Sequence, residues 1–190
     1  DRHRHRGGQQ PLEHPHQHQK AQRERDGLHH HDVALGLGVD FRPGDVASRL
    51  NFCTVDSAGN VTDRRAGRIP TEKGRALCDL LSAVDIPGVE VSVAAEMEYR
   101  AGVVFRGEGL SDGVGDSDPQ GTGIPPKPLV AHGTESQRMV EVANEFLAQT
   151  REILADQSPA NMVLMRGFGR YPELAQFDDV YGLRALGIAG

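Results

Sequence analysis

The sequence predicts an α+β fold in which a mostly antiparallel sheet has its helices packed on one face. Three observations predict this class: segments of alternating apolar residues, two segments with helical spacing of apolar residues, and a long connection rich in Gly, Pro and Asp. Their order along the chain is hairpin, helix, two strands, long loop, helix and strand. Elements in this order are typical of a sheet covered by a layer of helices.

The predicted strands are segments whose side chains alternate between two faces. The first begins near residue 45 and has one face with Leu50, Phe52 and Thr54 and another with Arg49, Asn51 and Cys53. Turn residues at 57–60 then reverse the chain. Further strands are expected over residues 61–65, 89–97, 98–107 and 161–169.

Two helices are predicted from apolar residues that recur every three or four positions. The first covers residues 70–84, with Thr71 as a candidate N-cap and an apolar stripe of Ala76, Leu77, Leu80, Leu81 and Val84. The second runs to about residue 156 from Thr134, which can form a capping box with Gln137. Residues 108–135 read as a long loop, and loops of that length are usually functional or mobile.

The bulk composition excludes several classes of function. The formal net charge is -6 at pH 7, so nothing global indicates nucleic acid or an anionic membrane as a partner. No apolar run approaches the length of a membrane span. The two cysteines, Cys53 and Cys78, lack a metal-binding spacing. We therefore expect a cytoplasmic protein with reduced thiols and no signal peptide.

Residues 1–32 differ in composition from the rest of the chain. They hold eight of the nine histidines, many Gln and Arg, and few apolar residues. Such a segment cannot bury enough surface to offset the entropy of ordering it, which predicts a disordered or non-native leader. The alternative, a His-rich metal-binding tract, is disfavoured because no fixed ligand spacing repeats.

A cluster of arginines follows the first predicted hairpin. Arg64, Arg65 and Arg68 lie in the segment DRRAGR, beside Gly67. Arginine presents a planar fork of donors that matches carboxylate and phosphate oxygens, and glycine lets a ligand approach the backbone. The segment therefore suits a small dianion, although a solvated turn whose arginines pair with nearby acids remains the alternative.

Other arginines lie on or at the ends of predicted strands. Arg49 shares the polar face of the first strand with Asn51, and Arg166 precedes a second glycine-rich stretch. Arg100 and Arg106 share one strand face, but six residues separate them by roughly 20 Å, too far to hold one phosphate together. The alternative is that these arginines cover apolar surface with their stems.

Three blocks of the sequence resemble one known family. They are PGDVASRLNFCTVDSAGNVTDRRAGRI, EYRAGVVFRGEGLSDGVGDSDPQGTG and PANMVLMRGFGRYPELAQFDDVYGL, in this order. They are similar to successive blocks of the archaeal-type cofactor-independent phosphoglycerate mutases, within the alkaline phosphatase superfamily. The similarity runs over most of residues 33–190.

The resemblance implies an architecture of two domains. Family members have a metal-bearing phosphatase domain and a smaller inserted domain, and residues 33–190 resemble the inserted domain. The nucleophilic serine and the ligands of the divalent ions (Mn, Mg or Zn) would lie in the absent phosphatase domain, so no catalytic or metal-binding residue is expected here. His132 is the only histidine after residue 32, which agrees with that expectation.

The resemblance also implies an activity and a set of substrate-binding residues. The full-length enzyme would interconvert 3-phosphoglycerate and 2-phosphoglycerate in glycolysis and gluconeogenesis. The phosphoglycerate and the phosphatase domain would be its partners, and the fragment alone would be inactive. The residues in the matching blocks that would bind substrate are Arg49, Asp63, Arg64, Arg65, Arg68 and Arg100, with Arg64 and Arg68 ranked first.

Two departures from the family pattern leave alternatives open. The connection at residues 156–158 is short, and Tyr99 stands where many relatives have His. The chain could instead be the lid domain of another phosphatase or phosphonate hydrolase of the superfamily, or an inactive remnant.

Overall fold

The computed structural model describes residues 38–171. The predictions for residues 1–32 and for the stretch after residue 171 lie outside this part. The elements, in chain order, are β1 (Val46–Val55), β2 (Val61–Asp63), η1 (Ala66–Arg68), α2 (Thr71–Leu81), β3 (Glu90–Ala95), β4 (Arg100–Arg106), η2 (Thr134–Ser136), α3 (Gln137–Ile153) and β5 (Met162–Arg170).

The sheet is built around β1, which pairs on one side with β4 and on the other with β5. β3 extends the sheet beyond β4, and the short β2 pairs with the end of β1. Every pairing is antiparallel. The first strand predicted from alternating side chains is thus β1, which lies inside the sheet between β4 and β5.

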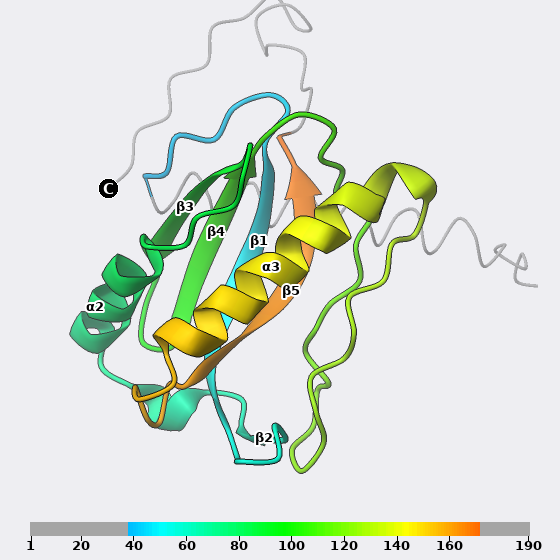
Figure 1. Cartoon of the computed structure of the whole chain (residues 1–190). Coiled ribbons are helices and arrows are strands. Elements are labelled where there is room, and N and C mark those ends of the chain that lie inside the picture. Colours follow the sequence, from blue (N-terminus) through cyan, green and yellow to red (C-terminus); the bar gives the residue numbers. More distant parts are fainter. Residues whose placement is uncertain (1–37, 172–190) are drawn as a thin grey trace, which may run out of the picture.

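Both long helices, α2 and α3, lie on the same face of the sheet (Figure 1). The main core lies between them and that face, and its largest buried side chains include Leu50, Phe52, Leu77, Phe105 and Phe146. The rings of Phe105 on β4 and Phe146 on α3 meet edge to face, with their centroids 5.5 Å apart. The predicted fold class, an antiparallel sheet with helices on one face, is confirmed.

The predicted stripe of α2 is wrong in two of its five positions. Ala76 and Leu80 are exposed, and the buried positions within the helix are Gly74, Leu77, Cys78 and Leu81. The cause is close packing at Gly74, where an added Cβ would lie 2.5 Å from the backbone oxygen of Glu98. The helix turns its glycine toward the β3–β4 connection and leaves Leu80 outside.

The predicted N-terminal caps of both helices are also wrong. Pro70 precedes α2, and Thr71 is its first residue, whose Oγ1 accepts a hydrogen bond from the Glu98 N–H at 3.1 Å. Thr134 belongs to the 3-10 turn η2, so α3 begins only at Gln137, without a side-chain cap. Tertiary contacts and a preceding turn take the place of the local capping signals.

The long loop between β4 and η2 follows the outer edge of β5. The Ser117 N–H donates to the Met165 carbonyl at 2.9 Å, and the Met165 N–H donates to Ser117 Oγ at 2.8 Å. The predicted loop at residues 108–135 is thus found, and these two bonds fix its middle against the strand.

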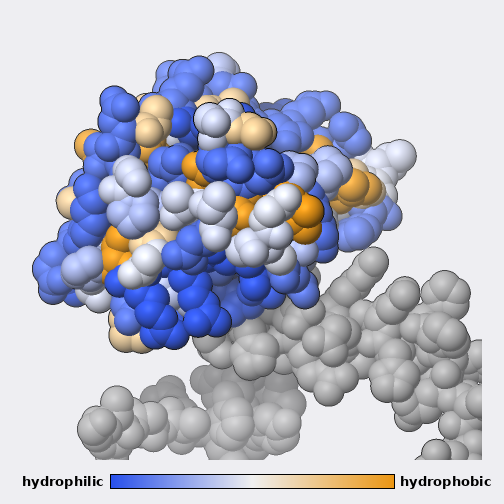
Figure 2. All heavy atoms as spheres, turned by 90° about the horizontal axis from the view of Figure 1, so that it is seen from below, coloured by the Kyte–Doolittle hydropathy of each residue, from blue (hydrophilic) through white to orange (hydrophobic). Residues whose placement is uncertain are grey.

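The face of the molecule seen from below is mostly polar (Figure 2). The view from below shows a largely hydrophilic face with apolar atoms in small, separate areas (Figure 2). Among residues 38–171 no helix is both long and apolar enough to cross a membrane.

Candidate anion-binding site

The face of the sheet away from the helices gathers three arginines from three strands. In the register of β1, Arg49 lies opposite Arg166 on β5 and opposite Gly102 on β4. Asn51, two residues along the same face, lies opposite Arg100 on β4. Side chains two apart on a strand point the same way. Adjacent strands are about 4.8 Å apart. The register therefore brings residues that are far apart in sequence onto one small surface.

These side chains line a cavity of about 320 Å³. Its lining residues are Arg49, Leu50, Asn51, Glu96, Tyr99, Arg100, Ala101 and Arg166. Gly102, opposite Arg49 on β4, places no side chain on this face of the sheet. The volume is that of a small-molecule site, and three of its lining side chains are cationic.

Arg49 has a buried donor with no partner. Its Nε makes no hydrogen bond within residues 38–171, although the atom is shielded from solvent. An unpaired buried donor costs free energy, and a charged one costs more. An anion in the cavity would supply the missing acceptor, so this atom is the feature that points most directly to a ligand.

A bulge in β5 turns Arg166 toward this cavity. The pairing with β1 shifts so that Ser48 faces Phe168 while Arg49 faces Arg166, which leaves Gly167 as the extra residue. Gly167 has a φ of 59°, in the left-handed region that glycine adopts at such bulges. Phe168 consequently packs in the main core, whereas Arg166, two residues earlier, lies on the opposite face.

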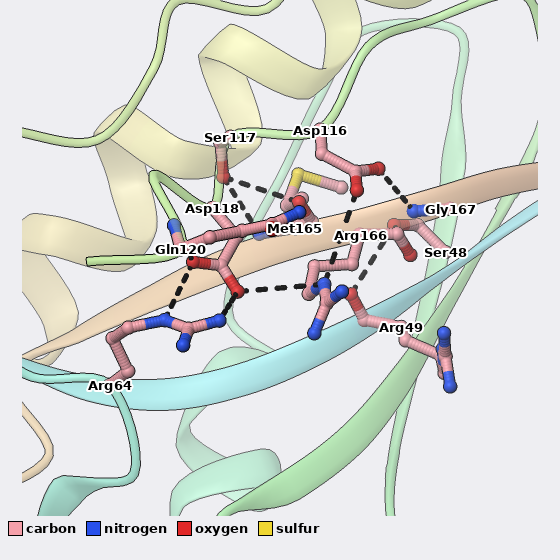
Figure 3. A network of polar contacts seen from close by, with 10 residues as sticks. All are labelled: Ser48, Arg49, Arg64, Asp116, Ser117, Asp118, Gln120, Met165, Arg166 and Gly167. Carbon is pink, nitrogen blue, oxygen red and sulfur yellow. Dashed lines mark hydrogen bonds and ion pairs between the residues drawn. The ribbon is translucent and has the colours of Figure 1, made fainter.

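A buried carboxylate connects Arg166 to the DRRAGR segment (Figure 3). Asp118 is fully buried. Arg64 donates from Nε to its Oδ1 at 2.9 Å and from Nη2 to its Oδ2 at 2.6 Å. Arg166 Nε lies 3.5 Å from Oδ2, and the Gln120 N–H donates to Oδ1 at 2.8 Å. Burial raises the pKa of Asp118, whereas the hydrogen bonds from Arg64 and Gln120 lower it. The lowering effects together outweigh the effect of burial, so the pKa of Asp118 lies below its usual value.

Of the six predicted substrate-binding residues, the structure brings two into the cavity. Arg49 and Arg100 both line it. Arg100 also has a carboxylate nearby, because Glu96 Oε1 lies 3.5 Å from its Nη1. Arg64 does not line the cavity, and two of its three side-chain nitrogens donate hydrogen bonds to Asp118.

The other three predicted residues lie outside the cavity lining. The Asp63 carboxylate accepts hydrogen bonds from the backbone N–H groups of Arg65 at 2.8 Å and Gly67 at 2.6 Å, so it holds the loop together. Arg65 is exposed, and the side chain of Arg68 is 60% exposed, 3.8 Å from Glu98. Their contact with substrate stays a prediction.

The backbone of this loop is strained. Ala66, Gly67 and Arg68 have φ values of 46°, 62° and 52°, and left-handed residues other than glycine cost roughly 1–2 kcal/mol each. Strain of this kind clusters at functional sites, which supports a role for the loop near the cavity.

Sequence reasoning did not assign Arg166 or Asp118 to the site. The glycines after Arg166 were the available signal, because they permit both close approach and a bulge. Asp118 gave no such signal: its partner Arg64 is 54 positions away, and only the fold brings the two together.

At the far end of the same face, Arg106 is held by a second buried carboxylate. Its Nε and Nη2 donate to the two oxygens of Asp45 at 2.9 and 2.8 Å. Arg100 and Arg106 thus serve different ends of β4, as their spacing predicted. Asp45, which is 1% exposed, resembles Asp118 in chemistry but lies outside the cavity lining.

The described residues do not fit a metal centre. Between residues 38 and 171 no group of three or more His, Cys, Asp or Glu side chains is placed to hold a metal ion. What these residues can do chemically is bind and orient an anion with several arginines.

Comparison with known proteins identifies the family. Residues 33–161 match the family model described as 2,3-bisphosphoglycerate-independent phosphoglycerate mutase. A probable 2,3-bisphosphoglycerate-independent phosphoglycerate mutase of Thermus thermophilus is 46% identical over 158 residues, which cover 82% of this chain and 39% of that protein. The corresponding mutase 1 of Archaeoglobus fulgidus is 40% identical over 174 residues, covering 82% and 42%.

A solved structure agrees with these relatives. The cofactor-independent phosphoglycerate mutase of Thermoplasma acidophilum superposes with a TM-score of 0.70 at 38% identity, over 77% of this chain and 42% of that one. The chain thus spans about two fifths of the length of the proteins that it matches. The chain belongs to the family of 2,3-bisphosphoglycerate-independent phosphoglycerate mutases.

Proposed function

We propose that this chain is the substrate-holding part of an enzyme that interconverts 3-phosphoglycerate and 2-phosphoglycerate. The observation that carries the proposal is the cavity in which Arg49, Arg100 and Arg166 converge, with a buried Arg49 donor that lacks a partner. Family membership supports the class of substrate.

The cavity chemistry suits a ligand with two anionic groups. A phosphoglycerate carries a carboxylate and a phosphate, and both are matched by the planar donor fork of arginine. Asn51 adds an amide that can both donate to and accept from a hydroxyl. Glu96 lines the same cavity and disfavours an anion at its own end, which would help to orient the ligand.

The proposed task of the chain is to retain and orient the glycerate. In the reaction the phosphoryl group would pass from one hydroxyl oxygen of the glycerate to the nucleophile of the phosphatase domain and from there to the other hydroxyl oxygen. The glycerate must stay bound between these two events, or water would receive the phosphoryl group instead. Fixed positioning of this kind can lower a barrier by several kcal/mol.

The proposal places the rest of the machinery outside residues 38–171. The nucleophile and divalent ions, with Mn, Mg or Zn as candidates, would belong to a phosphatase domain of the alkaline phosphatase superfamily. That domain would be the partner of this chain, and the whole enzyme would serve glycolysis and gluconeogenesis in the cytoplasm.

A chimera tests the proposal. Residues 38–171 replace the matching segment of the Thermus thermophilus relative, and conversion of 3-phosphoglycerate is followed in a coupled assay. We expect the chimera to convert substrate, and we expect neither the 190-residue chain alone nor the relative without the segment to do so. Release of inorganic phosphate by a folded chimera that forms no 2-phosphoglycerate would favour the lid of a phosphatase. A folded chimera with neither activity would favour an inactive remnant.

A further inference from the structure

We propose that Asp118 is a positioning residue of the anion site: it fixes Arg64 and Arg166 so that Arg166 presents its charge to the cavity beside Arg49. The inference rests on the proposed function in one respect, namely that the cavity takes a phosphorylated hydroxy acid. Asp118 itself does not line the cavity and acts only through the arginines.

The Asp118 carboxylate is held by donors on both of its oxygens. Both oxygens of Asp118 accept hydrogen bonds, Oδ1 from Arg64 Nε and the Gln120 N–H, and Oδ2 from Arg64 Nη2. Arg166 Nε lies 3.5 Å from Oδ2 and forms an ion pair with it without a hydrogen bond. The side chain is fully buried, so water does not compete for these oxygens. A carboxylate with several fixed donors restricts the orientation of each of them.

The segment that carries Asp118 is itself anchored to β5. Its neighbour Ser117 makes hydrogen bonds to the backbone N–H and carbonyl of Met165 on β5. On the other side of Ser117, Asp116 Oδ1 accepts the N–H of Gly167 at 2.7 Å, at the bulge that turns Arg166 (Figure 3). The carboxylate is therefore anchored to the same strand as the arginine that it orients.

The negative charge of Asp118 also keeps two positively charged groups close together. Arg64 and Arg166 both approach Asp118, and without its negative charge the two guanidinium groups would repel each other. Asp118 and Asp116, whose Oδ2 lies 4.0 Å from Arg166 Nε, together balance the charges of the two arginines. Glu96 likewise balances Arg100, so Arg49 carries the excess positive charge of the cavity. Asp118 holds Arg166 beside it.

The experiment measures anion binding by the 190-residue chain. Inorganic phosphate and 3-phosphoglycerate are titrated by calorimetry into the wild-type chain, Asp118→Asn and Asp45→Asn. Asp45→Asn is the matched control, because Asp45 is equally buried and holds Arg106 in the same bidentate way far from the cavity. We expect Asp118→Asn to weaken phosphate binding by about tenfold or more, as loss of a charge-assisted contact does, and Asp45→Asn to leave it unchanged.

A second variant covers the case in which Asp118→Asn does not fold. Arg64→Lys keeps the charge but cannot form the fork, and Arg64 does not line the cavity. We expect it to fold and to weaken phosphate binding severalfold. The ¹⁵Nε–Hε signal of Arg64 provides a further readout: it should be protected from exchange in the wild type and lose that protection in Asp118→Asn.

The outcomes separate the inference from the proposed function. Three results would overturn the positioning role. The first is a folded Asp118→Asn chain that binds phosphate as tightly as the wild type, and the second is an equal loss of phosphate affinity in Asp45→Asn. The third is a wild-type chain that binds no anion. If Asp118→Asn does not fold, wild-type affinity in Arg64→Lys would overturn it. If the wild type binds phosphate, Asp118→Asn weakens that binding, and 3-phosphoglycerate binds no tighter than phosphate, the positioning role stands and the proposed substrate is wrong.

Discussion

Arg49 differs from the other arginines of the site in having no internal counter-charge. Arg64, Arg100 and Arg166 each have a carboxylate within 4.0 Å, whereas no ion pair or side-chain hydrogen bond of Arg49 occurs in the described part of the chain. Its desolvation is therefore uncompensated until a ligand arrives. An anion should gain more from Arg49 than from a residue whose charge is already neutralised.

This difference predicts a large effect for Arg49. In the chimera, Arg49→Gln should lower kcat/KM by about tenfold to over a hundredfold, as expected when a charge-assisted hydrogen bond worth ~1.5–3 kcal/mol is lost. Arg49→Lys should recover only part of the loss, because an ammonium cannot reproduce the fork. Arg75→Gln, on the exposed side of α2, is the control and should have no effect. Full activity in a folded Arg49→Gln chimera would contradict the site.

The chimera assay can also test whether Arg68 contacts the substrate. The sequence ranks it among the first substrate contacts, while the structure leaves it exposed beside Glu98. A loss of tenfold or more in Arg68→Ala would add the strained loop at residues 66–68 to the site. An unchanged kcat/KM would limit the site to the residues of the cavity.

Asp118 predicts the behaviour of the chain in acid. Its folded pKa is lowered, so its stabilising effect is present above the unfolded value of about 3.9 and is lost as the pH falls through the folded pKa. The melting temperature of the wild type should therefore fall more steeply than that of Asp118→Asn between about pH 5 and pH 2. Asp40 and Asp56, whose pKa values are also lowered, are present in both proteins and cancel in the comparison. Thermal unfolding of both proteins across this pH range tests the prediction. Melting temperatures that fall in parallel in the two proteins would contradict it.

Helix α2 is positioned by a contact that only glycine allows. Gly74 packs against the backbone oxygen of Glu98, at the turn that carries the chain from β3 into Arg100 of the cavity. In the same connection between β3 and β4, the Glu98 N–H donates a hydrogen bond to Thr71 Oγ1. The first turn of α2 therefore contacts this connection at two points, Thr71 and Gly74. The helix thereby supports one wall of the anion site from the opposite face of the sheet.

Replacing this glycine should destabilise the fold. Gly74→Ala would gain about 1 kcal/mol of helix propensity, but its Cβ would meet a backbone atom at 2.5 Å. We expect the free energy of unfolding to fall by about 1–3 kcal/mol, as in other overpacked sites. Gly121→Ala is the control, because its Cβ would have only an ordinary contact at 3.6 Å. A Gly74→Ala variant as stable as wild type in denaturant titration would show that the turn can move away.

The strands could be predicted from sequence better than the helix faces and the site. Alternation assigned Arg49 and Asn51 to one face of β1 because the side-chain period of a strand is two. The stripe of α2 was wrong because the deciding contact, Gly74 against Glu98, is not local. The site depended on two non-local facts: the register that sets Arg100 opposite Asn51, and the bulge that turns Arg166 to their side.

The two cysteines report on the integrity of the whole domain. Burial, with smaller effects of Asp118 and Asp63, raises the pKa of Cys53 to about 12, and burial with Asp79 raises that of Cys78 to about 12. Since the thiolate is the reactive form, neither thiol should react with a disulfide reagent at pH 8 while the chain is folded. Both should react once denaturant unfolds it. Rapid modification of either thiol in the native chain would reveal local opening on its side of the sheet.

Phe41, Asp45 and Val46 lie beside Arg170 and Tyr171 at one end of the sheet. Val46 faces Arg170 across β1 and β5, the Tyr171 N–H donates to the Asp45 carbonyl at 3.3 Å, and the rings of Phe41 and Tyr171 are 5.4 Å apart. Neighbouring strands are only about 5 Å apart, so a unit cut at residues 45 and 171 would have its two ends close together. The unit could then be spliced into a surface turn of an unrelated host with little stretching of that turn. A fluorescent protein carrying such a splice near its chromophore would turn anion capture by the arginines into an optical signal.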